Sequence, residues 1–227
     1  MDTSSDYRIK IAEAALAKLT RIIKTGNIPY HINKEKTLNI ARDIYSHLMN
    51  IKYCYLPAQT IIQSQMIKDY EKRVHELADI LRGFPLRKTT HKEELIMATI
   101  KWCLRILLDL KERLKLGEEN KIENAIDVIA AEIVSLSKHP NSDKLKVTRV
   151  TTGAESYTLV TNIQDIKKGE VRAIAILLPI DLRGIISEAM FCSKPLDPTL
   201  KGKRPQSKDI DTKSINKEIT KILSEMK

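Results

Sequence analysis

The chain has 227 residues and 42% hydrophobic residues, enough for one large or two small domains with a buried core. Its formal net charge of +10 favours a polyanionic partner such as nucleic acid or an anionic membrane surface, and solubility alone is the other explanation. The three cysteines have no CxxC spacing, and the chain has neither a signal-peptide pattern nor a long apolar stretch. We therefore expect no disulfide framework, no metal site and no membrane span, and a cytoplasmic location.

The first half of the chain carries a helical pattern. Apolar residues step by three and four over residues 4–25, and Gly26 then ends the run. The same spacing predicts further helices over residues 38–48, 62–81 and 96–114. The short connections contain Gly or Pro, which makes consecutive helices antiparallel neighbours. We predict an antiparallel helical bundle over residues 1–117 and a linker over 118–124.

The pattern changes beyond the linker. Short apolar or β-branched runs predict five strands, which read DVIAAEIVSL, LKVTRVTT, YTLVTNI, EVRAIAILL and GIISEAMFC. Polar turn segments separate them: HPNSD, TGAES, QDIKKG and PIDLR. Five strands in about 65 residues favour a small barrel over residues 125–193, so the fold class is α + β.

The remaining residues, 194–227, read as a basic tail followed by a terminal helix. The tail is rich in Lys, Pro and Ser and is predicted to be flexible or to wrap the surface. The helix carries an apolar stripe of Ile215, Ile219, Ile222 and Met226. Two roles are open for this stripe: it pairs two copies into a homodimer, or it folds back on its own barrel.

The turn between the first two predicted strands leads into HPNSDKLKVTRV, residues 139–150. Pro140 disfavours the helical conformation at His139, and the polar residues that follow favour a tight turn. This stretch resembles the signature of His-Pro, two residues, Asp-Lys-Leu and a strand in the tRNA-binding OB-fold domain. That domain family occurs in the C-terminal extension of methionyl-tRNA synthetases, in synthetase cofactors, in endothelial-monocyte-activating polypeptide and in free-standing tRNA-binding proteins.

A second stretch strengthens the resemblance. PIDLRGIISEAM, residues 179–190, is similar to the family's closing signature of Leu-Arg-Gly, a short gap, Ser, one residue, Gly and Met. TLVTNI, residues 158–163, lies where the family has a strand end, and Ala189 stands where the family usually has glycine. The resemblance covers about residues 125–193. It implies a five-stranded OB-fold barrel that binds tRNA.

The candidate RNA-binding residues come from the resemblance and from local charge. The resemblance implies phosphate, base or apolar contacts for Asn162, Arg183, Ser187 and Met190. Candidate phosphate contacts flank the first motif, at Lys138, Lys144 and Arg149, and a mobile basic clamp is expected at Lys201, Lys203 and Arg204. The alternative for each cation is a solvated surface charge, and for Met190 it is a place in the barrel core.

Charge and aromatic content narrow the expected RNA. Residues 125–193 contain eight Lys and Arg and eight Asp and Glu, so the tail or the bundle must supply much of the attraction for phosphate. Tyr157 and Phe191 are the only aromatic residues of this stretch, too few for a platform that stacks successive bases. The sequence therefore favours recognition of folded RNA over generic single-strand binding.

Motifs for catalysis are missing from the sequence. It contains no GxxxxGK[ST], GxGxxG, HExxH or GxSxG pattern and neither active-site signature of the synthetases in which this domain is found. His139 has no second histidine in the barrel, so a role in packing the turn is favoured over a catalytic base or a metal ligand. We predict a protein without catalytic residues and without a cofactor.

Together these features predict a non-catalytic tRNA-binding protein that serves as an accessory or adaptor factor for aminoacyl-tRNA synthetases. The expected partners are tRNA, an aminoacyl-tRNA synthetase and a second copy of the chain, and no membrane. A different class stays open, because related barrels resemble a small secretion chaperone. In that alternative the same barrel binds peptides.

Overall fold

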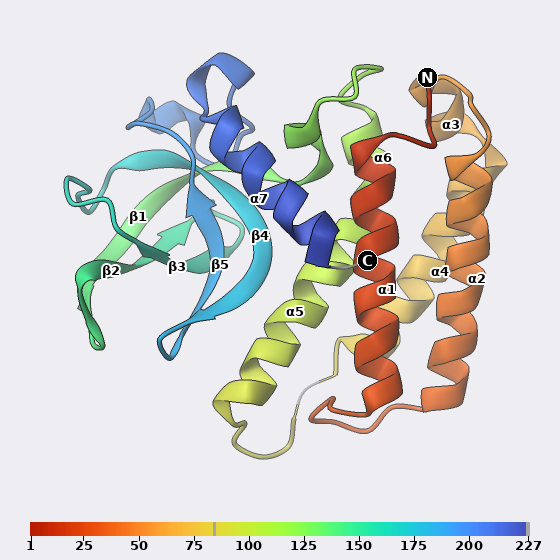
Figure 1. Ribbon diagram of the computed structural model, residues 1–227, viewed down its shortest axis with the longest axis horizontal. Coiled ribbons are helices and arrows are strands. Elements are labelled where there is room, and N and C mark those ends of the chain that lie inside the picture. Colours follow the sequence, from red (N-terminus) through yellow and green to blue (C-terminus); the bar gives the residue numbers. More distant parts are fainter. Residues whose placement is uncertain (84, 226–227) are drawn as a thin grey trace. The chain divides into compact units, whose positions relative to one another are not determined.

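The computed structural model describes residues 1–83 and 85–225, and they form two units (Figure 1). The helical unit contains Met1–Ala125 together with the chain from Lys221 onward, and the barrel unit contains Ile126–Thr220. This arrangement confirms the α + β class, with helices first, a five-stranded sheet next and a terminal helix last. No helix within the described ranges combines the length and apolar character needed to cross a bilayer.

The helical unit consists of α1 to α6 and a final 3₁₀ turn. Their bounds are α1 Tyr7–Thr25, α2 Lys34–Lys52, α3 Ala58–Gln63, α4 Gln65–Leu81, α5 His91–Leu108, α6 Leu110–Leu114 and η1 Ile122–Ala125. Helix α1 begins at Asp6, whose carboxylate accepts the N–H of Arg8, and it ends at Gly26, which has a φ of 69°. The predicted first helix and its glycine stop are confirmed.

Two predicted helices are each broken into two. Ser64 has an extended backbone, and its hydroxyl accepts the N–H of Ile67 and donates to the carbonyl of Ile61. It therefore ends α3 and begins α4, because a serine side chain can cap a helix in place of its backbone. Asp109 lies between α5 and α6 in the last predicted helix; its backbone N–H still donates to the Arg105 carbonyl, and no side-chain bond of Asp109 caps α6. Periodicity alone does not reveal such breaks, since the apolar spacing continues across them.

A buried arginine joins the ends of the helical unit. Arg8 is 1% exposed and forms an ion pair with Asp6, at 2.7 Å between Nη2 and Oδ2. Its Nη1 donates to the carbonyls of Arg113 and Gly117, at 3.2 and 2.7 Å. The buried guanidinium thus has a carboxylate and two carbonyls as partners, and these bonds hold the start of α1 against the segment that follows α6.

The predicted linker, residues 118–124, is tied to the helical unit. Glu118 accepts the N–H of Ala58 at 2.7 Å, and Asn120 accepts the N–H of Tyr7 at 2.9 Å. The segment then enters the 3₁₀ turn η1.

The barrel unit contains all five predicted strands. Their bounds are β1 Val128–His139, β2 Ser142–Thr151, β3 Ser156–Thr161, β4 Val171–Leu182 and β5 Ile185–Phe191. They form one antiparallel sheet in the order β3-β2-β1-β4-β5. Strands β1 and β4 are longer than predicted, because the expected separators HPNSD and PIDLR are largely absorbed into the strands. Pro179 is tolerated within β4 because it falls in a register shift between Ile176 and Ile180.

Side chains link the two outer strands and so close the barrel. The Ser187 hydroxyl on β5 accepts the N–H of Val160 on β3 at 3.1 Å. The Glu188 carboxylate accepts the N–H of Thr158 at 2.9 Å. These bonds satisfy backbone donors that an open sheet edge would leave exposed.

The tail continues the sheet. Gly202 donates its N–H to the carbonyl of Ala130 at 2.8 Å, and Ala130 donates its own to the carbonyl of Lys203 at 2.9 Å. Residues 202 and 203 thus lie beside β1 where β2 has ended, since the β1–β2 pairing stops at Glu132 and Thr151. This part of the tail, which is predicted to be flexible or to wrap the surface, is hydrogen-bonded to β1 as part of the barrel.

The chain ends in α7, Thr212–Glu225. Ile215 and Ile219 are fully buried and Ile222 is 6% exposed in the single chain. They do not form the exposed apolar stripe that pairing of two copies would require, so this route to a homodimer is not supported. Met226, the last member of the predicted stripe, lies outside the described residues.

Candidate nucleic-acid interface

Two tight hairpins meet at one end of the barrel, and each carries one of the two sequence motifs. Pro140 and Asn141 connect β1 to β2, and Arg183 and Gly184 connect β4 to β5. Arg183 and Gly184 have φ angles of 55° and 92°, the left-handed pair typical of a two-residue hairpin turn. Glycine suits the second position, because a Cβ at this φ is strained.

Hydrogen bonds between the hairpins form a closed set, which we call the two-hairpin latch: His139, Asn141, Leu182 and Arg183. The N–H of Asn141 donates to Nδ1 of His139 at 3.0 Å. Nδ1 is therefore the acceptor, so Nε2 carries the hydrogen and donates to the Leu182 carbonyl at 3.0 Å. Nδ2 of Asn141 donates to the Arg183 carbonyl at 2.9 Å, and Nη1 of Arg183 donates to the Asn141 carbonyl at 3.2 Å.

The latch explains the first motif physically. His139 is 4% exposed, and both ring nitrogens are used within the barrel. The imidazole thus fixes the Arg183 turn relative to the β1–β2 turn. Arg183 itself remains exposed.

Basic side chains gather beside the latch. Lys138 on β1 is paired in register with Lys146 on β2, and Lys146 is paired with Thr161 on β3. Nζ of Lys146 donates to the Gln164 carbonyl at 2.6 Å, and the Gln164 side chain donates to the carbonyls of Lys144 and Asn162. These bonds bring Lys138, Lys144 and Asn162 to the same end of the barrel.

The outer face of β2 and β3 continues from this end. Arg149 is exposed and paired with Ser135 and Thr158, both on the same outer face. Val147 and Val160 form the neighbouring pair and are half-buried, so apolar surface lies beside the arginine. In OB folds this face and the two hairpin loops are the usual nucleic-acid surface.

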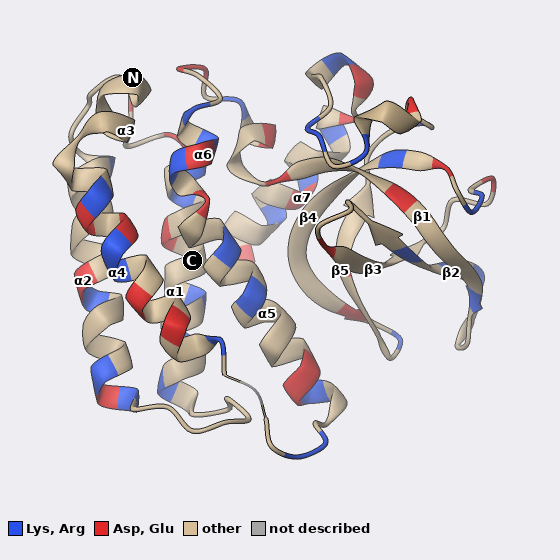
Figure 2. Ribbon diagram, turned by 180° about the vertical axis from the view of Figure 1, so that it is seen from behind, with Lys and Arg blue, Asp and Glu red and all other residues tan. Residues whose placement is uncertain are grey.

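The barrel cations near the latch are not neutralised by carboxylates. Lys138, Lys144, Arg149 and Arg183 form no ion pair within the described part of the chain. Two barrel carboxylates are occupied, because Glu170 pairs with Arg172 at 2.9 Å and Glu132 with Lys201 at 2.6 Å. Lys and Arg are interspersed with Asp and Glu over both units (Figure 2). Local placement, and not net charge, therefore decides where phosphate could bind.

Two predicted residues of the closing motif differ in exposure. Ser187 is 6% exposed, and its hydroxyl accepts from Val160 and donates to the carbonyl of Ala189. It therefore serves the closure of the barrel, and its surface is not open to a ligand. Met190 is half-buried, in contrast to the buried Ala189 and Phe191 beside it. Its alternation with these residues places it on the outer face of β5.

The predicted basic clamp lies elsewhere on the barrel. Lys201 is engaged with Glu132, and Nη1 of Arg204 donates to the Ile126 carbonyl at 3.2 Å. Lys203, which is exposed, bonds through its backbone to Ala130. Ala130 is nine residues from His139 along β1, which corresponds to roughly 25–30 Å. The structure does not bring the clamp residues together with the latch, and it holds them by hydrogen bonds and an ion pair.

Sequence reasoning missed Asn141, Lys146 and Gln164, whose bonds assemble the latch end. Asn141 belongs to the first motif, where the sequence predicts only a turn and not a bond to the second hairpin. Lys146 could have been included from the sequence, since it is a basic residue within the same motif as Lys144 and Arg149.

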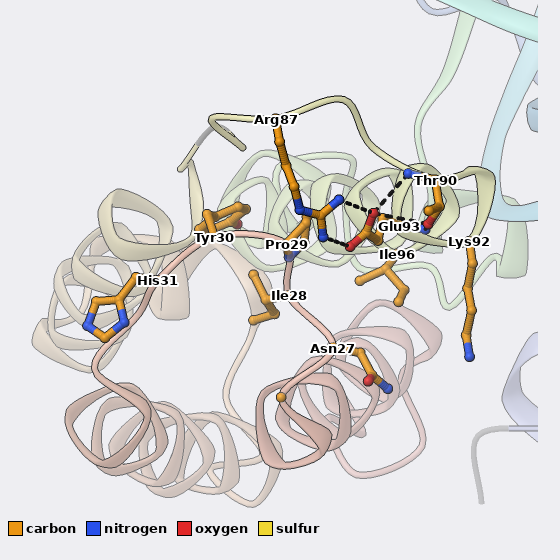
Figure 3. A pocket seen from close by; sticks show the side chains of 11 residues that line it. Asn27, Ile28, Pro29, Tyr30, His31, Arg87, Thr90, Lys92, Glu93 and Ile96 are labelled. Atoms are coloured by element: carbon orange, nitrogen blue, oxygen red, sulfur yellow. Dashed lines mark hydrogen bonds and ion pairs between the residues drawn. The ribbon is translucent and has the colours of Figure 1, made fainter.

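The helical unit also contains a polar hollow (Figure 3). It has a volume of about 570 Å³ and lies between the α1–α2 connection, with Tyr30 and His31, and the start of α5. Arg87 pairs with Glu93, and Glu93 also accepts from the backbone and hydroxyl of Thr90 (Figure 3). Lys92 and His31 line the same hollow. Arg87 and the Thr90 backbone hold the pKa of Glu93 down at about 2. This network forms the capping box at the start of α5.

The described residues contain no group of three or more potential metal ligands. Burial raises the pKa of the Cys103 and Cys192 thiols to about 12, so both are neutral and poor nucleophiles at ordinary pH.

Comparison with known proteins agrees with the two units. Residues 1–117 match the family model described as "Alpha helical domain", and residues 128–212 match the model described as "Putative tRNA binding domain". Among curated proteins, the chain is similar to the phenylalanine–tRNA ligase beta subunit of Leptospira biflexa, with 36% identity over 76 residues. It is also similar to that subunit from Oceanobacillus iheyensis and Thermotoga maritima, with 33% and 31% identity over 87 and 77 residues.

These alignments cover 30–34% of this chain and 10–11% of the relatives, so the chain corresponds to about a tenth of their length. The family model for the helical unit, in contrast, covers more than half of the chain. The chain therefore belongs to the alpha-helical domain family over residues 1–117, and it carries a domain of the tRNA-binding family over residues 128–212.

Proposed function

We propose that the chain is a non-catalytic accessory protein that delivers or retains tRNA for an aminoacyl-tRNA synthetase. The tRNA-binding family of the barrel and the similarity to a synthetase subunit support this proposal. The observation that carries it is the two-hairpin latch, which joins both family motifs and leaves Arg183 exposed at the end of the barrel where Lys138 and Lys144 are also exposed.

The proposed interface contains the latch end and the outer faces of β2, β3 and β5. Lys138, Lys144, Arg149 and Arg183 contact phosphates, and Asn162 and Met190 contact sugar or base edges. Folded RNA is the preferred ligand, because an RNA duplex is recognised mainly through phosphate and 2′-hydroxyl contacts, whereas the barrel has little aromatic surface on which bases could stack. Ser187 does not contact RNA in this proposal, because its hydroxyl is used to close the barrel. Lys201 and Arg204 do not contact RNA either, because their side chains are bound to other parts of the barrel.

The experiment measures fluorescence-anisotropy binding of tRNA, unstructured RNA and duplex DNA to the full chain at several salt concentrations. Tighter binding of tRNA is expected. Arg183→Ala should weaken it about 5- to 100-fold and reduce the slope of log K against log salt by about one, as loss of one phosphate contact predicts. Lys213→Ala, an exposed lysine on α7, is the matched control and should change neither quantity.

Equal, steeply salt-dependent binding of all three nucleic acids would contradict the proposal, because it would reduce the interaction to net charge. Unchanged tRNA affinity in a folded Arg183→Ala variant would remove the latch end from the interface. A peptide-binding barrel would instead suppress aggregation of an unfolded client while tRNA fails to bind, and this outcome would favour the chaperone alternative.

A further inference from the structure

The helical unit has a groove along α1 that the RNA proposal does not use. Two hollows of about 500 and 480 Å³ adjoin at their shared residues Glu13 and Ala17, and we call them together the α1 groove. Leu223 of α7 also lines the smaller one. The α1 groove extends along α1 from Tyr7 to Lys24. At 1.5 Å per residue this is about 26 Å, the length of a helix of four to five turns.

The part of the groove between α1 and α2 has an apolar floor. Leu16 and Ala41 are buried there, and Ala17 is exposed. The small alanines leave room for another backbone to approach closely. Tyr45 on α2 forms a wall and is 49% exposed. A tyrosine of this kind offers an apolar ring and a polar hydroxyl, which is why tyrosine is enriched at protein interfaces.

The rim of the groove is basic. Arg21, Lys24 and Arg42 are exposed and form no ion pair among the residues that the structure describes. The one acidic residue of the lining, Glu13, is already paired with Lys52 at 2.6 Å. Elsewhere in the unit, cations such as Arg73, Arg87 and Lys111 are paired with carboxylates. The groove thus combines an apolar floor with unbalanced positive charge.

We propose that the α1 groove binds an amphipathic α-helix of a partner protein, with apolar residues on the floor and acidic residues against the rim. Helices bind grooves of this kind through residues at positions i, i+3, i+4 and i+7. Phosphates of a nucleic acid would be attracted by the rim but would gain nothing from the apolar floor, whereas an acidic amphipathic helix matches both. This inference does not depend on RNA binding by the barrel.

Two synthetic helical peptides test the proposal against the full chain labelled with ¹⁵N. They share one Leu/Ala face, and their polar faces carry only Glu in one peptide and only Lys in the other. The acidic peptide should bind saturably and shift the amide signals of α1 and α2, and the basic peptide should bind at least tenfold more weakly. Arg21→Glu with Arg42→Glu should weaken the acidic peptide at least tenfold.

Lys68→Glu with Lys72→Glu is the matched control, since it makes the same change in charge at exposed positions of α4. It should alter binding less than twofold. Ala17→Gln tests the floor without a change in charge. Because Ala17 is exposed and glutamine suits a helix, the variant should fold normally and still bind the peptide more weakly.

The proposal is overturned if the acidic peptide does not bind, if both peptides bind equally, or if the shifts lie outside α1, α2 and the part of α7 around Leu223. It is also overturned if tRNA, added instead of peptide, shifts the same amides and loses more affinity than the peptide in the Arg21/Arg42 variant. That result would make the groove a nucleic-acid surface. Loss of tRNA binding in barrel variants alone would leave the groove proposal intact.

Discussion

Truncation of His139 to alanine tests the latch directly. The change removes an acceptor for the Asn141 N–H and a donor to the Leu182 carbonyl, at 3.0 Å each, and it empties the space of a side chain that is 4% exposed. Each hydrogen bond contributes about 0.5–1.5 kcal/mol, and the lost packing adds to this. We expect the free energy of unfolding to fall by about 2–4 kcal/mol.

The assay is urea unfolding followed by circular dichroism, with hydrogen exchange to localise the change. The loss of protection should concentrate in the two hairpins. His139→Gln is the partial control, because its amide can reach toward Leu182 but cannot reproduce the Nδ1 acceptor, and it should lose about half as much stability. An alanine variant within 0.5 kcal/mol of the parent would refute the reasoning.

The His139 variants also distinguish residues that position the RNA-binding surface from residues that contact RNA directly. A loosened latch should weaken tRNA binding because the Arg183 turn is no longer held in place. The salt dependence should stay the same, since no phosphate contact has been removed. Arg183→Ala should lower both affinity and salt dependence. If His139→Ala also reduced the salt slope, the imidazole would have to be treated as part of the contact surface.

Three further predictions follow from geometry and charge. Gly202→Ala should destabilise the barrel by about 2 kcal/mol more than Gly153→Ala in urea unfolding, because both glycines have positive φ but only at Gly202 would a Cβ lie 2.8 Å from a backbone oxygen. Ser187→Ala should cost about 1–2 kcal/mol in the same assay, because the N–H of Val160 loses its acceptor, and the lost exchange protection should lie in β3. The pKa of Glu93 is about 2 against an ordinary 4.5, so its stabilisation is present above pH 4.5 and is lost as the pH falls toward 2; Glu93→Gln should flatten acid unfolding monitored by circular dichroism over that window.

Much of the fold follows from periodicity and turn chemistry. The five strands and the helical runs lie where apolar spacing places them, and Gly26 ends α1 as its residue type predicts. The break at Ser64 could not be predicted, because capping by its side chain competes with a helical pattern that continues on both sides. The break at Asp109 could not be predicted either, since the apolar spacing continues across it. The path of the tail could not be predicted either. Gly202 and Lys203 bind β1 through backbone groups, and such bonds do not depend on a recognisable pattern of side chains.

The candidate site was predictable in part. The motifs indicated which residues belong to the latch end, but only the fold shows that His139 and Leu182 are partners across 43 positions of sequence. The sequence did not show which side chains of β2 face the barrel interior. Val147 is half-buried and Thr148 is fully buried, whereas side-chain polarity suggests the opposite order. The buried threonine is satisfied by the Leu159 carbonyl, a bond that sequence alone does not show.

The pairing of Ala130 with residues 202 and 203 has a consequence for the order of synthesis. The edge of β1 at Ala130 stays open until the ribosome has added about 70 more residues, which takes on the order of 4–14 s. An open edge is a template for pairing with another chain. Nascent chains, and fragments cut after β5, should therefore associate more readily than the full chain.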